Sequence, residues 1–254
     1  MRTLLYSATF TAAVCLGFAP AASAQNDFEW TGQLAPGQRL EIRDVNGSIK
    51  ASAAPGGNIV VTAVKKAGRR GSPSDVRIET AAYNGGVTVC VIYGSGDCRG
   101  GSARGENSLD NDTSVDFTVQ VPAGIGLSAR TVNGSIDANG LMSDTDASTV
   151  NGSVTVATSG TARATTVNGT IKAAMGQAPN GAKYSTVNGD VTLQLPASAN
   201  ATVRASTVSG SIRSDFPLTI STEPGPQRAS GTLGAGGQPL EISTVNGGIT
   251  LARR

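Results

Sequence analysis

Two close pairs of carboxylates are the residues in this sequence whose types and spacing could do acid–base or metal chemistry. Asp110 and Asp112 are separated by one residue, and so are Asp144 and Asp146. Neither pair has the ligand number or glycine spacing of a calcium loop, and aspartate in a loop most often serves the turn itself. The sequence contains no histidine, which excludes Ser-His-Asp and Cys-His catalysis and every zinc or haem site that needs imidazole. We therefore expect no enzyme activity, no catalytic residues, and no metal or cofactor site.

Cys90 and Cys98 are the second candidate for chemistry. They lie eight residues apart across a Gly-Ser-Gly turn. A reactive thiol pair is the alternative, but the spacing is not Cys-x-x-Cys and no His or Lys lies nearby to lower a thiol pKa. If the chain is exported, as its first residues indicate below, an even pair predicts one local disulfide. Such a bond stabilises a fold by about 2–3 kcal/mol for a loop of this size on the chain-entropy model.

The first 24 residues have the three parts of a secretory signal peptide. Arg2 supplies a positive start, an apolar stretch runs from Leu4 to Phe18, and Ala22-Ser23-Ala24 provides small residues where signal peptidase cuts. The apolar stretch is too short for a transmembrane anchor, and no later segment could span a bilayer. We expect cleavage after Ala24 and a periplasmic, secreted or cell-surface location.

The composition predicts thin β-structure rather than a helical bundle. The chain has 254 residues, of which 33 are Gly and only 4% are aromatic. No long segment carries the apolar stripe of a helix. The 20 basic and 18 acidic residues are scattered along the chain, so no basic stripe indicates nucleic acid as a partner. We expect an essentially all-β protein.

A four-residue phrase, Thr-Val-Asn-Gly, recurs through the second half of the chain. The steps between its Asn positions are 18, 17, 20 and 21 residues, and then 37. A period near 20 is typical of stacked repeat architectures. A forerunner, Asp44-Val45-Asn46-Gly47, lies near the start of the mature chain. The Asn positions of the repeats, one of which holds Ser, are Asn133, Asn151, Asn168, Asn188, Ser209 and Asn246.

Each phrase is followed by alternating apolar and polar residues. Many of the apolar residues are β-branched, and a period of two is the pattern of a half-buried β-strand. We expect the apolar residue two positions after each Gly, and also the Val of each phrase, to point into a common core. The expected core residues are Val132, Val150, Val167, Val187, Val208, Val245, Ile136, Val154, Ile171, Val191, Ile212 and Ile249.

Two all-β architectures are compatible with Asn-Gly between alternating strands. In an antiparallel meander each Asn-Gly would form a two-residue hairpin turn. In a parallel β-solenoid it would form one corner of each coil, so that like residues stack about 4.8 Å apart. Recurrence of the same residues at the same place favours the solenoid. The Asn and Ser side chains would then form a hydrogen-bonded structural ladder along one corner, with Gly permitting positive φ.

The segment before the repeats predicts a different region. Strand-like runs separated by Gly-, Pro- and Ser-rich loops occupy residues 25–122. We expect them to form a small β-sheet or sandwich that covers the first coil. Residues 123–254 would then form the β-solenoid.

The order of these segments resembles the DUF4097 family of bacterial exported β-strand-repeat proteins, which are often labelled adhesins. The resemblance rests on Leu40–Ile49, on Val119–Gly124, on the repeated Thr-Val-Asn-Gly and on the ending from Gly236 to Leu251. It implies a β-solenoid and an envelope or surface location. It brings no established catalytic residues, because fold does not determine function.

Three functional hypotheses follow from these patterns. The first is an exported, non-catalytic envelope protein whose Ser- and Thr-rich faces serve as an adhesin or a scaffold. The second is a carbohydrate-binding or carbohydrate-active β-helix that uses Asp and Arg on one face. The third is a self-assembling envelope element, in which an uncapped terminal coil stacks on another chain. Envelope glycans or surface proteins are the expected partners in the first two hypotheses.

Overall fold

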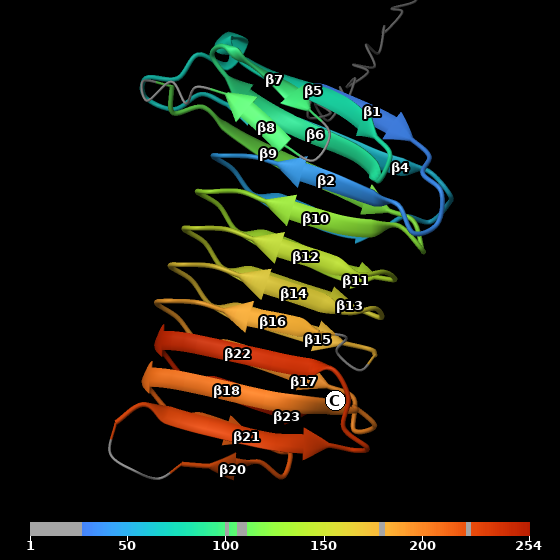
Figure 1. Ribbon diagram of the computed structural model, residues 1–254. Helices are drawn as coiled ribbons and strands as arrows, with labels where there is room; N and C mark the ends of the chain where they lie inside the picture. The colour runs from blue at the N-terminus through green and yellow to red at the C-terminus, as the bar shows by residue number, and fades with distance from the viewer. Residues whose placement is uncertain (1–26, 100–101, 106–110, 178–180, 222–224) are drawn as a thin grey trace, which may run out of the picture.

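The computed structural model describes residues 27–99, 102–105, 111–177, 181–221 and 225–254. The predicted signal peptide, residues 1–24, lies outside these described residues. Figure 1 shows a long stack of strands that are organised into two large sheets. Within the described residues, sheet A has 10 strands and sheet B has 11 strands. The predicted all-β fold class and the parallel β-solenoid are confirmed.

Each coil of the stack contains one strand from each sheet. β10 (Gly126–Arg130) of sheet B leads through a Thr-Val-Asn-Gly corner into β11 (Ile136–Leu141) of sheet A, and a second loop returns the chain to sheet B. Neighbouring coils pair in parallel and in register. A hairpin at each Asn-Gly would reverse the strands, so this pairing excludes the meander. The following strands are β12 (Thr145–Ser148), β13 (Val154–Thr158), β14 (Ala162–Thr165), β15 (Ile171–Met175), β16 (Ala182–Ser185) and β17 (Val191–Leu195).

The stacking order of the last coils differs from their order in the chain. β22 (Pro239–Asn246) pairs in parallel with β16 on one side and with β18 (Ala201–Ser209) on the other. In the same way, β23 (Ile249–Arg253) lies between β17 and β19 (Ile212–Ser214). The C-terminal coil is therefore inserted into the stack, as the red strands among the orange ones in Figure 1 show. The 37-residue step from Ser209 to Asn246 contains the strands through which the chain passes before it enters the inserted coil.

An early segment of the chain is inserted at the other end of the stack. β2 (Arg39–Arg43) lies between β10 and β6 (Gly86–Tyr93), in parallel with both. β3 (Ile49–Ala53) lies between β11 and β9 (Ser114–Val121), also in parallel. The coil of residues 39–53 therefore belongs to the solenoid stack, and both sheets run without a break from the expected N-terminal region into the repeats.

Antiparallel strands lie at the ends of the stack. At the N-terminal end, β1 (Phe28–Gly32) pairs with β4 (Ile59–Lys66), β4 pairs with β9, and β5 (Val76–Tyr83) pairs with β6. At the other end, β20 (Thr219–Ile220) pairs with β21 (Gln227–Leu233), which pairs with β18. These strands end the regular repeat of sheet B on both sides and that of sheet A at the N-terminal end. The remaining elements are the 3₁₀ helix η1 (Pro73–Asp75), β7 (Gly96–Arg99) and β8 (Ser102–Gly105).

One apolar core runs along the inside of the stack. Sheet B contributes small residues such as Ala129, Ala147 and Ala164, which suit a narrow interior. Sheet A contributes the apolar residue two positions after each Gly, as the sequence predicts. These residues are at most 6% exposed: Ile136, Val154, Ile171, Val191, Ile212 and Ile249.

The expectation that the Val of each phrase lies in the core is wrong. The Thr before each Val is buried instead, and Thr149 Oγ1, for example, donates to the Gly134 carbonyl oxygen of the neighbouring coil at 2.9 Å. Val and Asn then both face outward at the corner, which interrupts the alternation. A strict period of two, extended from the buried Val154 back through the corner, therefore predicts that Val150 is buried, although it faces outward. The six valines are between 38% and 57% exposed: Val132, Val150, Val167, Val187, Val208 and Val245.

The exposed Asn side chains form a hydrogen-bonded ladder along this corner. Asn133 Nδ2 donates to Asn46 Oδ1 at 2.7 Å, and the same bond recurs up the stack at 2.8–2.9 Å. Each such bond contributes about 0.5–1.5 kcal/mol net. Ser209 lies in register beyond the last Asn. The order of the ladder is Asn46, Asn133, Asn151, Asn168, Asn188 and Asn246.

Close contact between main chains explains the Gly in each phrase. A Cβ on Gly152 would lie 2.1 Å from the carbonyl oxygen of Gly134, and a Cβ on Gly134 would lie 1.9 Å from that of Gly47. Gly152 has a positive φ but Gly134 does not. The requirement that the corners share is therefore the approach of the neighbouring coil, rather than the positive φ that the sequence suggested.

One carboxylate is buried where the inserted N-terminal coil turns its corner. Asp44 is 7% exposed, and Thr131 Oγ1 donates to its Oδ2 at 3.5 Å. Its Oδ1 has no hydrogen-bond partner among the described residues. Burial, with a smaller contribution from the negative charge of Asp116, raises the pKa of Asp44 to about 7, although hydrogen bonds from the main chain partly oppose the shift.

Two aspartate substitutions should differ in their effect on stability, because one position lies inside a coil and the other is exposed at its corner. Ile171→Asp should destabilise the fold by several kcal/mol, because it places an unpaired carboxylate in the core. Val167→Asp should change stability by about 1 kcal/mol or less, since Val167 is 38% exposed. Thermal melts of both variants by circular dichroism test this difference. A large loss of melting temperature in Val167→Asp would contradict an outward-facing Val.

Asp44→Asn should change how stability depends on pH. The pKa of Asp44 is raised from 3.8 to about 7 on folding, so its stabilising contribution is complete below pH 3.8 and is lost as pH rises to about 7. The full difference corresponds to about 4 kcal/mol. Urea unfolding of wild type and Asp44→Asn from pH 4 to 7 measures it. The wild type should lose stability relative to the variant over this range, and parallel curves would contradict the raised pKa.

Candidate functional site

The close acidic pairs are not brought together into one site. Asp110 lies outside the described residues. Asp112 accepts hydrogen bonds from the main-chain N–H groups of Arg69 and Arg70 at 2.9 and 3.0 Å, which hold its pKa below the usual range. Asp144 accepts from the N–H and the hydroxyl of Thr161 at 3.0 and 2.8 Å. Both carboxylates therefore tie loops together, as aspartate commonly does in turns.

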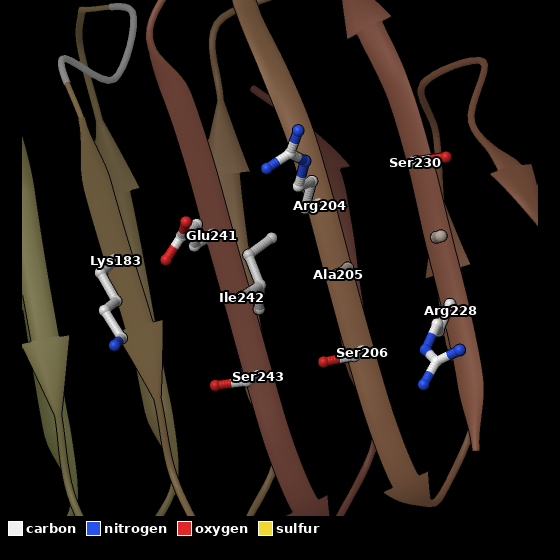
Figure 2. A pocket seen from close by; sticks show the side chains of 10 residues that line it. Lys183, Arg204, Ala205, Ser206, Arg228, Ser230, Glu241, Ile242 and Ser243 are labelled. Atoms are coloured by element: carbon white, nitrogen blue, oxygen red, sulfur yellow. The ribbon is translucent and has the colours of Figure 1, made fainter.

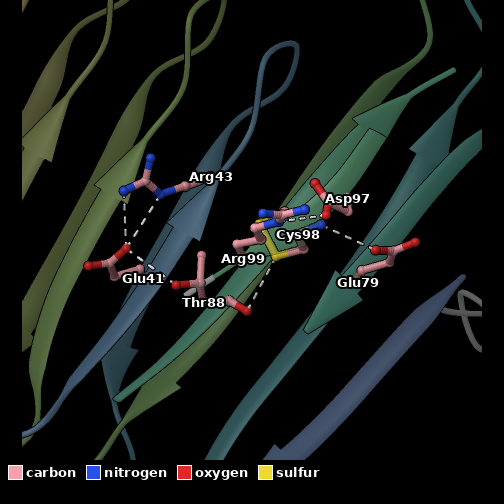
Figure 3. The surroundings of a disulfide bond; sticks show 8 residues. Glu41, Arg43, Glu79, Thr88, Asp97, Cys98 and Arg99 are labelled. Carbon is pink, nitrogen blue, oxygen red and sulfur yellow. Dashed lines mark hydrogen bonds and ion pairs between the residues drawn. A yellow bond between two sulfur atoms is a disulfide. The ribbon is translucent and has the colours of Figure 1, made fainter. Parts of the chain in front are cut away.

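Cys90 and Cys98 form a disulfide that joins β6 of sheet B to β7. Figure 3 shows its polar surroundings, where the Cys98 N–H donates to Glu79 Oε2 at 3.4 Å and Arg99 pairs with Asp97 at 2.7 Å. In the part of the chain that the structure describes, no group of three or more His, Cys, Asp or Glu side chains could hold a metal ion. Nor does any helix there have the length and apolar character needed to cross a membrane.

A row of hydroxyl groups runs along the outer face of sheet B. Each of five neighbouring strands contributes one half-exposed Ser or Thr, and the parallel register places them side by side. Thr165 donates to Ser148 at 3.0 Å, and the hydroxyls of Ser185 and Ser243 are 3.0 Å apart. Hydroxyl groups therefore recur at the strand spacing of about 4.8 Å. This hydroxyl row consists of Ser148, Thr165, Ser185, Ser243 and Ser206.

A charged row runs beside the hydroxyl row. Each of its members lies two positions earlier on the same strand, and therefore on the same face of the sheet. Asp146 pairs in register with Arg163, whose Nε also donates to the Gly181 carbonyl oxygen at 3.0 Å. Farther along, the register places one carboxylate between two cations. The charged row consists of Asp146, Arg163, Lys183, Glu241 and Arg204.

The outer face of sheet B is hollowed where β16, β22, β18 and β21 lie side by side (Figure 2). This basic hollow has a volume of about 420 Å³. Its small polar side chains are Ser206, Ser230 and Ser243. Its long side chains are Lys183, Arg204, Arg228 and Glu241, all of them exposed.

The outer face of sheet A offers a weaker site. Its hollow over Ala157 and Ala174 has a volume of about 180 Å³. Lys172 is the only charged residue among those that line it, beside neutral polar groups such as Thr155 and Thr192. Ligand sites combine a concave surface with a few convergent polar groups. The basic hollow on sheet B meets that description better than the hollow on sheet A.

Sequence reasoning did not single out the basic hollow. Lys183 and Glu241 are 58 positions apart in the chain, yet they are directly paired because β22 is inserted beside β16. The available signal was the short pattern of a charged residue two positions before a Ser, as in Arg204-Ala205-Ser206 and Glu241-Ile242-Ser243. That pattern predicts one face of a strand, but it does not say which strands become neighbours.

The chain is similar to one protein family and to solved structures of two bacterial proteins. A family model described as Toastrack DUF4097 matches residues 38–252. A solved structure of a "putative cell adhesion protein" from Clostridium sporogenes is 12% identical, with 89% of this chain and 99% of that chain covered and a TM-score of 0.41. A "putative adhesin" from Bacteroides fragilis is 12% identical, with 90% and 98% covered and a TM-score of 0.36. No curated protein matches the chain.

The family match extends over nearly all of the solenoid stack. It begins just before β2, whose coil carries the early Asp-Val-Asn-Gly phrase, and it ends within β23 of the inserted C-terminal coil. These are the segments on which the resemblance in the sequence rests. We conclude that this chain belongs to the DUF4097 (Toastrack) family.

Proposed function

We propose that this protein is an exported, non-catalytic adhesin or scaffold of the cell envelope, and that it binds its partner along the outer face of sheet B. The observation that carries the proposal is the hydroxyl row, in which five neighbouring strands each present one half-exposed hydroxyl group in register. A partner with repeating polar groups can make the same contact at successive strands. Glycans and repetitive surface proteins of the envelope have that property.

Many weak contacts in series suit such a partner. One hydrogen bond contributes only about 0.5–1.5 kcal/mol net. On a rigid surface, however, the first contact positions the others, so the later contacts cost less association entropy. The parallel ladders of both sheets and the Asn ladder hold the hydroxyl row in place before the partner arrives. The stack therefore supports adhesion along its length.

The placement of the carboxylates supports a non-catalytic role. Acid–base catalysis needs two groups that converge on one reacting bond. Asp112 and Asp144 instead accept hydrogen bonds within loops, and Asp146 faces outward opposite Arg163 in the charged row. These observations favour the binding hypothesis over a carbohydrate-cleaving β-helix.

The strands at the ends of the stack favour this proposal over self-assembly. Sheet B ends in β5 at one end and β20 at the other, both of which pair antiparallel with their neighbours. In sheet A the last strand is β19, which has 3 residues. Short or irregular edge strands are a poor template for pairing with another chain. Within the described part of the chain, a second solenoid would therefore find no regular coil edge to extend.

Export can be tested separately from binding. We expect the protein recovered from the periplasm or the medium to begin at Gln25, because Ala22 and Ala24 fit the two small sites of signal peptidase. N-terminal sequencing measures this directly. Ala24→Arg should leave an unprocessed precursor, whereas Ala24→Ser should be cleaved normally. Normal processing of Ala24→Arg would contradict the predicted cleavage site.

Adhesion through the hydroxyl row predicts a face-specific loss of binding. Ser148→Glu with Thr165→Glu replaces two hydroxyl groups of the row by longer, charged side chains and should reduce co-sedimentation with isolated cell envelopes by about fivefold or more. The matched control, Thr155→Glu with Thr192→Glu, adds the same charge to the outer face of sheet A and should leave binding within about twofold. An equal loss in both variants, or no binding by the wild type, would contradict the proposal.

A further inference from the structure

We propose that the basic hollow binds an acidic polysaccharide, whose carboxylate groups contact Arg204, Arg228 and Lys183. This inference rests on the proposed function and names the chemistry of the partner. The hollow lies at one end of the hydroxyl row and includes two of its members, Ser206 and Ser243. A glycan chain that lies along the row therefore reaches the three cations without changing direction.

The charge of the hollow favours an anion. Three cationic side chains and one carboxylate line it, which leaves a net charge of about +2 on a small area of surface. Among the described residues, none of these four groups forms an ion pair within 4 Å. The cations are therefore free to bind a ligand from solution.

Four other cations among the described residues, one on each of Arg43, Lys66, Arg77 and Arg99, form ion pairs with carboxylates. Arg43 lies 3.2 Å from Glu41, Lys66 lies 2.6 Å from Asp116, and Arg99 lies 2.7 Å from Asp97. These ion pairs all lie toward the N-terminal end of the stack, on residues before β10. The basic hollow at the other end is thus distinguished by the gathering of unpaired cations in one concave area.

The spacing of the cations suits a polymer rather than a single small anion. Lys183 and Arg204 are both in register with Glu241, on the two strands that flank β22, so their main chains are about 10 Å apart at two strand spacings. Arg228 is in register with Ser206 on the next strand, two positions along from Arg204. Successive acidic groups of a chain can therefore meet different cations.

The lining of the hollow supports recognition by charge and hydrogen bonds. The described residues that line it include no aromatic side chain on which a neutral sugar ring could stack. Ser206, Ser230 and Ser243 provide donors and acceptors for sugar hydroxyls. Arginine binds a carboxylate through two parallel N–H bonds, which adds geometric selectivity to the charge. A carboxylate-bearing glycan uses both kinds of group.

Glu241 provides a control in which the affinity for an anion should rise rather than fall. It lies between Lys183 and Arg204 in the charged row, and its carboxylate is one of the groups that line the hollow (Figure 2). A bound anion meets repulsion from this carboxylate, because like charges at close range disfavour each other. Removing its charge should therefore tighten binding, whereas removing the arginine charges should weaken it.

The test measures binding of the purified mature protein to polygalacturonate and to its methyl ester, which has the same backbone without the charge. Wild type should bind polygalacturonate and not the ester. Arg204→Gln with Arg228→Gln should weaken that binding by about tenfold or more, and Glu241→Gln should tighten it by about twofold or more. The control, Lys172→Gln with Arg213→Gln, removes equal charge from the outer face of sheet A and should stay within about twofold.

Three results would overturn the inference: equal binding of the polymer and its ester, an equal loss in the control, or binding to anionic phospholipid vesicles instead of polygalacturonate. Envelope co-sedimentation separates this inference from the proposed function. If wild type and the Arg204/Arg228 variant sediment equally, the hollow is not the glycan site but adhesion stands. If wild type binds polygalacturonate through the hollow yet does not sediment with envelopes, the hollow stands and the adhesion proposal fails.

Discussion

The contact between neighbouring coils at the Thr-Val-Asn-Gly corner is the constraint on which the rest of the structure depends. A buried Thr hydroxyl donates to the Gly carbonyl oxygen of the next coil, and a Cβ on that coil's Gly would overlap the main chain. Both contacts require the coils to stack in register. Once the register is set, the Asn amides align outside and the Ile and Val side chains align inside, because side chains alternate along a strand.

The same register determines the outer surface. Every outward position of a strand lies beside the equivalent position of its neighbours, so the hydroxyl row and the charged row extend along the axis of the stack. Insertion of the C-terminal coil then decides which charges meet. Because β22 lies between β16 and β18, the cations of two separate coils flank Glu241 and form the basic hollow. The binding surface proposed for this protein is therefore a consequence of stacking order.

Particular residues show how far sequence reasoning reached. Ile136 and Ile171 were predicted to be buried and are, since the strands after the corner keep a strict period of two. Val150 and Val167 were predicted to be buried and are exposed, since two consecutive residues face outward at the corner. Asn46 was seen only as a forerunner of the repeat, yet it is the first member of the ladder. The alternation of apolar and polar residues therefore predicted burial correctly within a strand, and it failed where the main chain turns.

The sequence by itself determined that the chain forms β-strands and where each corner lies, because these follow from local alternation and from a recurring four-residue phrase. It favoured a parallel stack over a meander, and the pairing of the strands in the structure decided between them. Only the tertiary structure decided the order in which the coils stack, since the repeated phrase is nearly the same at every corner and does not specify its neighbour. That order placed the last coil of the chain next to β16 and the coil of residues 39–53 next to β10. The basic hollow is invisible in the sequence for this reason: its charges come from segments that only the insertion makes neighbours.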